Sequence, residues 1–148
     1  MESNDLRKAG LKVTHPLMRI LALLDQLRSA PGVIDATLTS HLPMGDYGSG
    51  NTWAFDVPGY KFAPDESKSV VTDLVGPAFF RTMRIAMAQG REFTDQDREG
   101  TALVAVINED MARRYWPKGN ALGSTVIVQK KPVQVVGIVK NYAYHSPS

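Results

Sequence analysis

One segment constrains the fold more than any other, because it reads as a buried strand that runs directly into a capped helix. Residues 103–107 (LVAVI) are a continuous apolar run, which is typical of a strand buried on both faces. Asn108 is a good helix N-cap, and the acidic pair that follows it suits the positive end of a helix. Pro117 ends that helix. The sequence therefore predicts a strand followed by a helix over residues 103–116.

The other segments mix helical and strand periodicity. Residues 16–28 carry apolar residues at helical spacing, which predicts a helix with one buried face. Residues 33–40 alternate between apolar and polar residues and predict a strand with one buried face. Further strands are expected at 53–57, 70–75, 85–87, 125–128 and 133–139, and a short helix is expected after Pro77. Helices and strands without strict βαβ alternation favour an α+β domain with a mixed, mainly antiparallel sheet and two to three helices.

Composition argues against several classes of function. The net charge is only +2, and the densest basic spots, Lys130-Lys131 and Arg113-Arg114, are too short for a nucleic-acid surface. The absence of cysteine excludes disulfides, thiolate metal sites and cysteine catalysis. No stretch approaches the ~18 apolar residues that a membrane span needs. The N-terminal residues lack the apolar core of a signal peptide, so we expect either a cytosolic protein or a piece of a larger one.

The motifs that carry chemistry are incomplete. The three histidines, His15, His41 and His145, are scattered rather than set at ligand spacing. The glycines of residues 45–50 are not followed by the Lys-Ser or Lys-Thr of a phosphate-binding loop, and residues 95–100 start like a calcium loop that is not completed. We therefore expect a protein that is not an enzyme, with no catalytic residue, cofactor or metal.

A few residues have two open interpretations. Arg91 is expected in a structural ion pair, with an anion site as the alternative. Trp116 is expected in the core. Trp53, which borders the glycine-rich loop, and Tyr47 within that loop are the candidate interaction residues.

Seven short motifs occur in an order that is similar to a known family. They are Pro31-Gly32-Val33, GPAFFRTM at 76–83, GREFT at 90–94, VAVINE at 104–109, ARRYWP at 112–117, Leu122-Gly123 and VVGIV at 135–139. Together they resemble the MacB-like periplasmic core domain, the insert between the first two membrane helices of MacB/FtsX-type ABC transporter permeases. The chain departs from that pattern at Arg84, where the family often has Gly, at Ala86, where it often has Pro, and at residues 118–121.

The resemblance implies a truncated domain with two lobes. A porter-like lobe is expected at residues 11–40 and 70–142, and a smaller inserted lobe at 41–69. The domain would lie at the periplasmic face of the bacterial inner membrane and relay conformational change during export without catalysis. Its implied partners are the membrane helices of the same permease and a separate ATPase subunit or domain, with a periplasmic adaptor or lipoprotein and a second permease copy as candidates. The alternative is a freestanding ligand-binding or sensory domain, with a pocket formed by residues 45–52 and Trp53.

Overall fold

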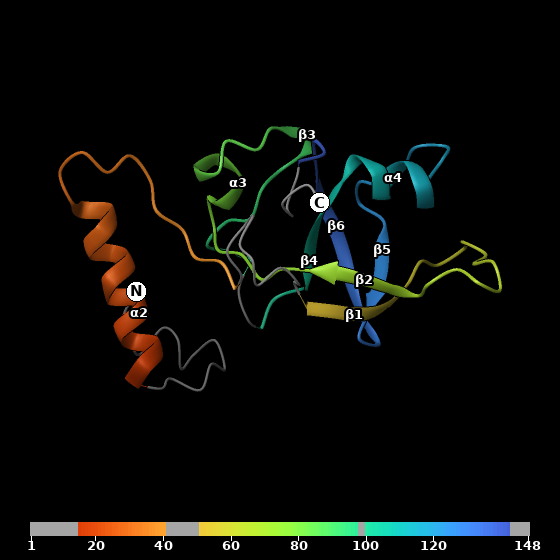
Figure 1. Ribbon diagram of the computed structural model, residues 1–148, viewed down its shortest axis with the longest axis horizontal. Coiled ribbons are helices and arrows are strands. Elements are labelled where there is room, and N and C mark those ends of the chain that lie inside the picture. The colour runs from red at the N-terminus through yellow and green to blue at the C-terminus, as the bar shows by residue number, and fades with distance from the viewer. Residues whose placement is uncertain (1–14, 41–50, 98–99, 143–148) are drawn as a thin grey trace.

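The computed structural model describes residues 15–40, 51–97 and 100–142. Figure 1 shows a sheet-based body with one long helix lying apart from it. The helices are α2 (His15–Ser29), α3 (Phe79–Thr82) and α4 (Glu109–Tyr115). The strands are β1 (Asn51–Asp56), β2 (Ser69–Thr72), β3 (Met87–Gly90), β4 (Val104–Asn108), β5 (Thr125–Val128) and β6 (Lys131–Val139). The predicted α+β class, with a mainly antiparallel sheet and three helices, is confirmed.

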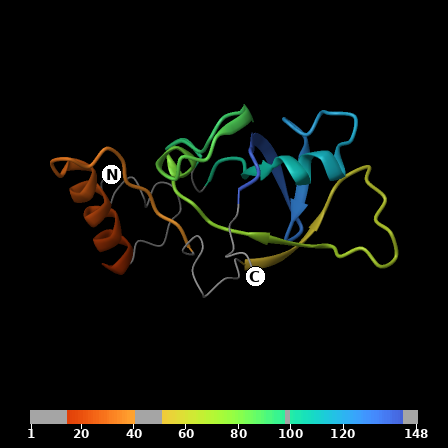
Figure 2. The ribbon, with the colours of Figure 1, turned by 45° about the horizontal axis from the view of Figure 1, so that its top comes forward.

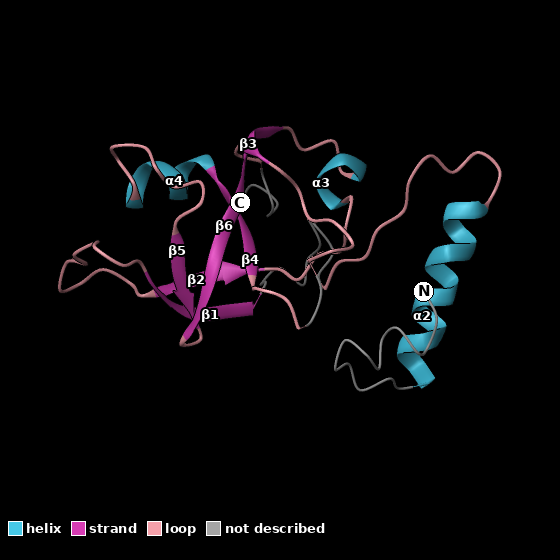
Figure 3. Ribbon diagram, turned by 180° about the vertical axis from the view of Figure 1, so that it is seen from behind, coloured by secondary structure: helices cyan, strands magenta, loops and turns pink. Residues whose placement is uncertain are grey.

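The long strand β6 organises the sheet. β5 is antiparallel to its first half, β3 is antiparallel to its second half, and β4 runs parallel to it. Because β3 and β4 both pair with Val139, they lie on opposite edges of β6. β1 pairs with β5, and β2 with β1, which completes a six-stranded sheet among the described residues. Figure 3 shows β6 crossing the middle of the body.

Two apolar clusters meet along β6. The first lies around Val135, which is fully buried, and includes Phe55, Ile107, Val126 and Ile138. The second joins Val139, at the end of β6, to Phe79 and Phe80 of α3. One strand therefore supplies residues to both clusters, and the two clusters are parts of one continuous body.

A close backbone contact between β3 and β6 depends on two glycines. A Cβ atom on Gly137 would lie 2.2 Å from the carbonyl oxygen of Arg91. A Cβ atom on Gly90, which has φ +72°, would lie 2.3 Å from the carbonyl oxygen of Val136. No side chain fits at these distances, so glycine at both positions lets the turn after β3 press against β6.

Two expectations about β4 and the hairpin have different outcomes. The hairpin over β5 and β6 is confirmed, and its turn residues Gln129 and Lys130 have φ of 49° and 64°, as in a type I′ turn. The expectation that residues 103–107 are buried on both faces is wrong. Only Ile107 is buried and Leu103 is 48% exposed, because β4 is an edge strand, paired with β6 alone among the described strands, and its faces are only partly covered.

The first helix forms where expected, but its surroundings do not match the prediction. α2 covers residues 15–29, and Leu24 is buried, yet Ile20, Leu23 and Leu27 are exposed. Figure 2 shows α2 standing away from the sheet. Apolar spacing predicts a helix but does not say what covers its face, so the predicted burial of that whole face is wrong.

The predicted strand at residues 33–40 is also largely wrong. Residues 33–38 have no regular secondary structure, and Ile34 is 99% exposed. Only a short antiparallel contact forms: Thr39 bridges Val75, and the backbone N–H groups of Ser40 and Gly76 donate to Leu74 and Leu38. We call α2 with residues 30–36 the arm, and residues 51–97 with 100–142 the body.

Candidate functional site

The candidate interaction residues occupy different environments. Trp53 is half-buried on β1, on the same face as the core residue Phe55, and is paired with Val70. Tyr47 lies outside the described residues, as do His41 and His145. A role for Trp53 and Tyr47 in an interaction stays a prediction. Within the described ranges, no group of His, Asp and Glu has the arrangement of a metal site.

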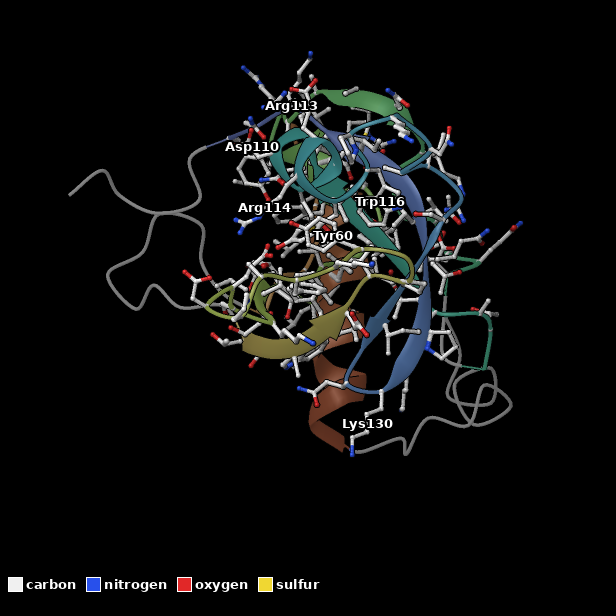
Figure 4. The ribbon with its side chains drawn as sticks, turned by 90° about the vertical axis from the view of Figure 1, so that its right-hand side faces the viewer. Tyr60, Asp110, Arg113, Arg114, Trp116 and Lys130 are labelled. Atoms are coloured by element: carbon white, nitrogen blue, oxygen red, sulfur yellow. The ribbon has the colours of Figure 1, made fainter. Side chains whose placement is uncertain are left out.

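At the end of the body away from the arm, aromatic side chains from three segments pack edge to face. The ring centroid of Tyr115 on α4 lies 5.3 Å from that of Phe55 on β1 and 4.9 Å from that of Tyr60. Phe62 lies 4.9 Å from Tyr60, and Trp116 packs against the same cluster. Trp116 is partly buried there, in agreement with its expected place in the core. Figure 4 shows Tyr60, Arg114 and Trp116 at this end of the molecule.

One carboxylate holds residues 57–68 onto α4. Glu66, with a side chain only 9% exposed, accepts hydrogen bonds from the Tyr60 hydroxyl, the Ala63 N–H and the Arg114 guanidinium, the last at 2.8 Å. Burial works to raise the pKa of Glu66, but the donors from Ala63, Arg114 and Tyr60 outweigh it and lower that pKa. These residues line a shallow depression, but the carboxylate is already satisfied by the protein. We therefore interpret Glu66 as a structural residue that holds residues 57–68 against α4.

The outer face of α4 carries charges that are paired within the chain. Arg113 pairs with Asp110 one helical turn away, and Lys140 pairs with Glu109 at 2.9 Å. The N-cap is as predicted: the Asn108 side chain accepts from the Met111 N–H at 2.9 Å. The described part of this end offers aromatic edges and paired charges for contact with another surface. It does not bring together a nucleophile and a base.

At the other end of the body, a second group of charges connects the body to the arm. Arg81 of α3 donates to Asp35 of the arm, with both Nε and Nη2 at 2.8 Å from Oδ2. Its Nη1 lies 3.5 Å from Oε1 of Glu92, in the turn after β3. The hydrogen bond from Arg81 lowers the pKa of Asp35. We call Asp35, Arg81 and Glu92 the joint.

The turn that carries Glu92 is fixed by its own ion pair. Arg91 forms two hydrogen bonds to the Asp97 carboxylate, at 2.6 and 2.8 Å. The Thr94 N–H donates to the same carboxylate at 2.8 Å, which resembles the predicted capping arrangement between Thr94 and Asp97. The expected structural ion pair of Arg91 is confirmed. The Arg91 hydrogen bonds lower the pKa of Asp97 to about 2.

The depressed pKa of Asp97 predicts a loss of stability in acid. Because the folded-state pKa lies below the ordinary 3.8, the contribution is complete above pH 4 and disappears as the pH falls through about 2. We expect Asp97→Asn to lower the free energy of unfolding by about 1–2 kcal/mol near neutrality and to match the wild type below pH 2. Urea unfolding at a series of pH values measures this difference, with Asp95→Asn as the control for the loss of one negative charge in the same turn. A difference that is independent of pH would contradict the prediction.

Sequence reasoning did not identify Glu66, Asp35, Arg81 or Glu92. Glu66 lies in a stretch that reads as polar loop, and its partner Arg114 is 48 residues away. Asp35 and Arg81 are separated by 46 residues. No local signal marks such pairs, because exposed charges without partners have the same pattern in the sequence.

A mixed six-stranded sheet with three helices, α2 lying apart from it, defines an α+β domain among the described residues. The family model for the MacB-like periplasmic core domain matches residues 19–147, and the chain belongs to this family. None of the described helices has both the length and the apolar character needed to cross a membrane.

Curated relatives match parts of the chain. A macrolide export ATP-binding/permease protein MacB of Aggregatibacter actinomycetemcomitans is 31% identical over 67 residues, 45% of this chain and 10% of that protein. A probable syringafactin export ATP-binding/permease protein of Pseudomonas syringae is 33% identical over 69 residues, 46% of this chain and 10% of that protein. A MacB of Shewanella is 25% identical over 108 residues, 73% of this chain and 16% of that protein. The matched regions thus cover a small part of each relative.

Two solved structures share the fold. The periplasmic region of MacB from Actinobacillus actinomycetemcomitans aligns with a TM-score of 0.62 at 21% identity, over 84% of this chain and 52% of that one. The extracellular domain of the noncanonic ABC-type transporter YknZ from Gram-positive bacteria aligns with a TM-score of 0.55 at 17% identity, over 82% and 57%.

One departure from the family pattern has a visible backbone correlate. Arg84, where the family often has glycine, has φ 56°, in the left-handed region that glycine adopts without strain. The backbone therefore retains a conformation that suits glycine, although the side chain is that of arginine.

Proposed function

We propose that this chain is the non-catalytic extracytoplasmic domain of an ABC transporter permease, at the periplasmic face of a bacterial inner membrane, and that it relays conformational change during export. Family membership supports the setting, since the family is by its description a periplasmic core domain. The relay role is our inference from the architecture.

The observation that carries the proposal is the path of β6 through the body. The arm and α3, which carries Arg81, lie at one end and α4, which carries Tyr115, lies at the other, as the ribbons in Figures 1 and 3 show. Because β6 contributes to both apolar clusters, a displacement at the arm end cannot be absorbed between them without breaking core packing. A stiff body with separate contact regions is what a rigid-body mover requires.

The proposed partners follow from the relatives. Those relatives are named ATP-binding/permease proteins, so we propose that ATP binding by a linked ATPase domain or subunit supplies the motion through the membrane helices of the same permease. The end that carries α4 would face a periplasmic adaptor or lipoprotein, and the full transporter would hold two copies. Trp53 and Tyr47 remain proposed contact residues, and residues 41–69 a proposed second lobe, although β1 within that range pairs with β5 of the main sheet. The relatives are named for different exported compounds, so we propose the role and no single substrate.

The test uses the complete permease that contains this domain, reconstituted in nanodiscs with its ATPase. A donor fluorophore on Lys118→Cys, an exposed position beyond α4, reports energy transfer to acceptor lipids in the disc. The expected result is a change in transfer on addition of ATP, and none in an ATPase variant that cannot bind nucleotide. Unchanged transfer during sustained ATP hydrolysis would contradict a relay through this domain.

A further inference from the structure

Arg81 stands between two carboxylates that belong to different parts of the molecule. Asp35 is in the arm, whereas Glu92 is in the turn after β3 of the body. Arg81 itself is anchored in the body, because the preceding residues of α3, Phe79 and Phe80, are buried in the second apolar cluster. Its side chain is 66% exposed and so has room to change partners.

The two carboxylates are not equally satisfied. Asp35 accepts the close hydrogen bonds from Arg81 and one from the Ala36 N–H at 2.9 Å. Glu92 is only approached by Arg81, at 3.5 Å. Its Oε2 is buried and has no hydrogen-bond partner among the described residues. A buried carboxylate oxygen without a hydrogen-bond donor raises the free energy of the folded protein. A donor that reaches the carboxylate lowers that free energy.

The backbone that carries Glu92 is held in place. Its carbonyl oxygen accepts from Arg91 Nη1 at 3.1 Å, and Arg91 is held in turn by Asp97. The close contact of Gly90 and Gly137 fixes the same turn against β6. The Arg81 guanidinium, which is 66% exposed, is therefore free to change partners, whereas the backbone of Glu92 stays in place.

We propose that the joint is a two-position switch, in which Arg81 binds Asp35 when the arm is docked and transfers to Glu92 when the arm is released. The transfer gives the guanidinium a carboxylate in both positions, and it gives Glu92, which Arg81 now only approaches at Oε1, a close donor in the released one. The two positions thus differ in which contact is made rather than in whether Arg81 is paired. That is the condition for two states of similar free energy.

The contacts of the neighbouring residues place the pivot between residues 36 and 37. The Thr37 hydroxyl donates to the Pro77 carbonyl at 2.9 Å, and residues 38–40 pair with residues 74–76, so this part stays on the body. Arg28 donates to the Ala36 carbonyl at 2.9 Å, which connects two parts of the arm to each other. As a regulatory element, the switch rests on the proposed function. Its existence in the isolated chain does not depend on that function.

The test measures the distance from the arm to the body in the 148-residue chain. Because the sequence has no cysteine, Gln26→Cys on α2 and Lys118→Cys beyond α4, both exposed, accept spin labels at defined positions. Distance distributions are recorded for the labelled parent chain and for Asp35→Asn, Arg81→Gln and Glu92→Gln. Asp95→Asn is the matched control, since it removes a carboxylate from the same turn as Glu92. Circular dichroism confirms that each variant is folded.

The switch makes opposite predictions for the two carboxylates. Asp35→Asn is expected to raise the released population roughly two- to fivefold, the range of an exposed ion pair, and Arg81→Gln is expected to do the same. Glu92→Gln removes the charge of the competing carboxylate, which weakens its attraction for the guanidinium, and is expected to lower that population below the parent value. If Glu92→Gln releases the arm as Asp35→Asn does, the three residues form a fixed network and the switch is overturned. If neither substitution changes the distribution, it is overturned as well. The nanodisc experiment tests the relay separately, so failure of one proposal is distinguishable from failure of the other.

Discussion

Gly137→Ala is expected to destabilise the chain by about 3 kcal/mol, because the added methyl group has no space. Its Cβ would lie 2.2 Å from the Arg91 carbonyl oxygen and 2.7 Å from the end of the Met87 side chain. Met87 can move aside, but the backbone of Arg91 is held in place, because its N–H donates to the Val136 carbonyl at 3.0 Å. Relief therefore requires β3 to separate from β6, with loss of the strand pairing at Gly90.

Gly119→Ala is the matched control for this substitution. Gly119 has φ +80°, but a Cβ there would meet nothing within 4 Å. The expected cost is roughly 1–2 kcal/mol, from backbone strain alone. Urea unfolding followed by tryptophan fluorescence measures both variants. Equal losses in the free energy of unfolding for Gly137→Ala and Gly119→Ala would contradict the close backbone contact between β3 and β6.

Phe79→Ala is expected to cost about 3–5 kcal/mol, the range for removing a buried aromatic side chain. Phe79 is 2% exposed and packs edge to face with Phe80, with ring centroids 5.3 Å apart. The second apolar cluster is small, so the loss of its largest fully buried member leaves α3 with little to hold it. Because Val139 of β6 belongs to this cluster, we expect the whole body to lose stability and not α3 alone.

The control for Phe79→Ala is Met83→Ala, just after the same helix, where the side chain is 42% exposed. Its expected cost is below about 1 kcal/mol. Unfolding is followed at two probes, tryptophan fluorescence and far-UV circular dichroism. Coincident transitions with a shifted midpoint are expected for Phe79→Ala. A separate early transition would show that the two clusters unfold independently, contrary to the role given to β6.

Features of this fold with partners close in sequence were predictable. The Asn108 cap, the Thr94 and Asp97 turn and the β5–β6 hairpin are each made by residues a few positions apart. Such contacts follow from side-chain chemistry and chain geometry, which a short stretch of sequence contains. The resemblance carried by the collinear motifs extended this local information to the whole fold.

The contacts between distant segments were not predictable in the same way. The partners in the Glu66–Arg114 and Asp35–Arg81 pairs lie on different elements, and each residue alone reads as solvated surface. The burial of the α2 face was overestimated, because helical spacing of leucines does not identify the element that covers them. The apolar run of β4 was read as doubly buried for a similar reason: what covers the two faces of a strand depends on elements elsewhere in the chain.

The central position of β6 has a consequence for biosynthesis. β6 spans residues 131–139, so β1, β3, β4 and β5 all emerge from the ribosome before the strand on which the sheet depends. Until β6 arrives, the apolar strands made earlier have no complete core and stay open to wrong pairing. We therefore expect the described sheet to form only after β6 has been synthesised, and the earlier strands to need protection from aggregation until then.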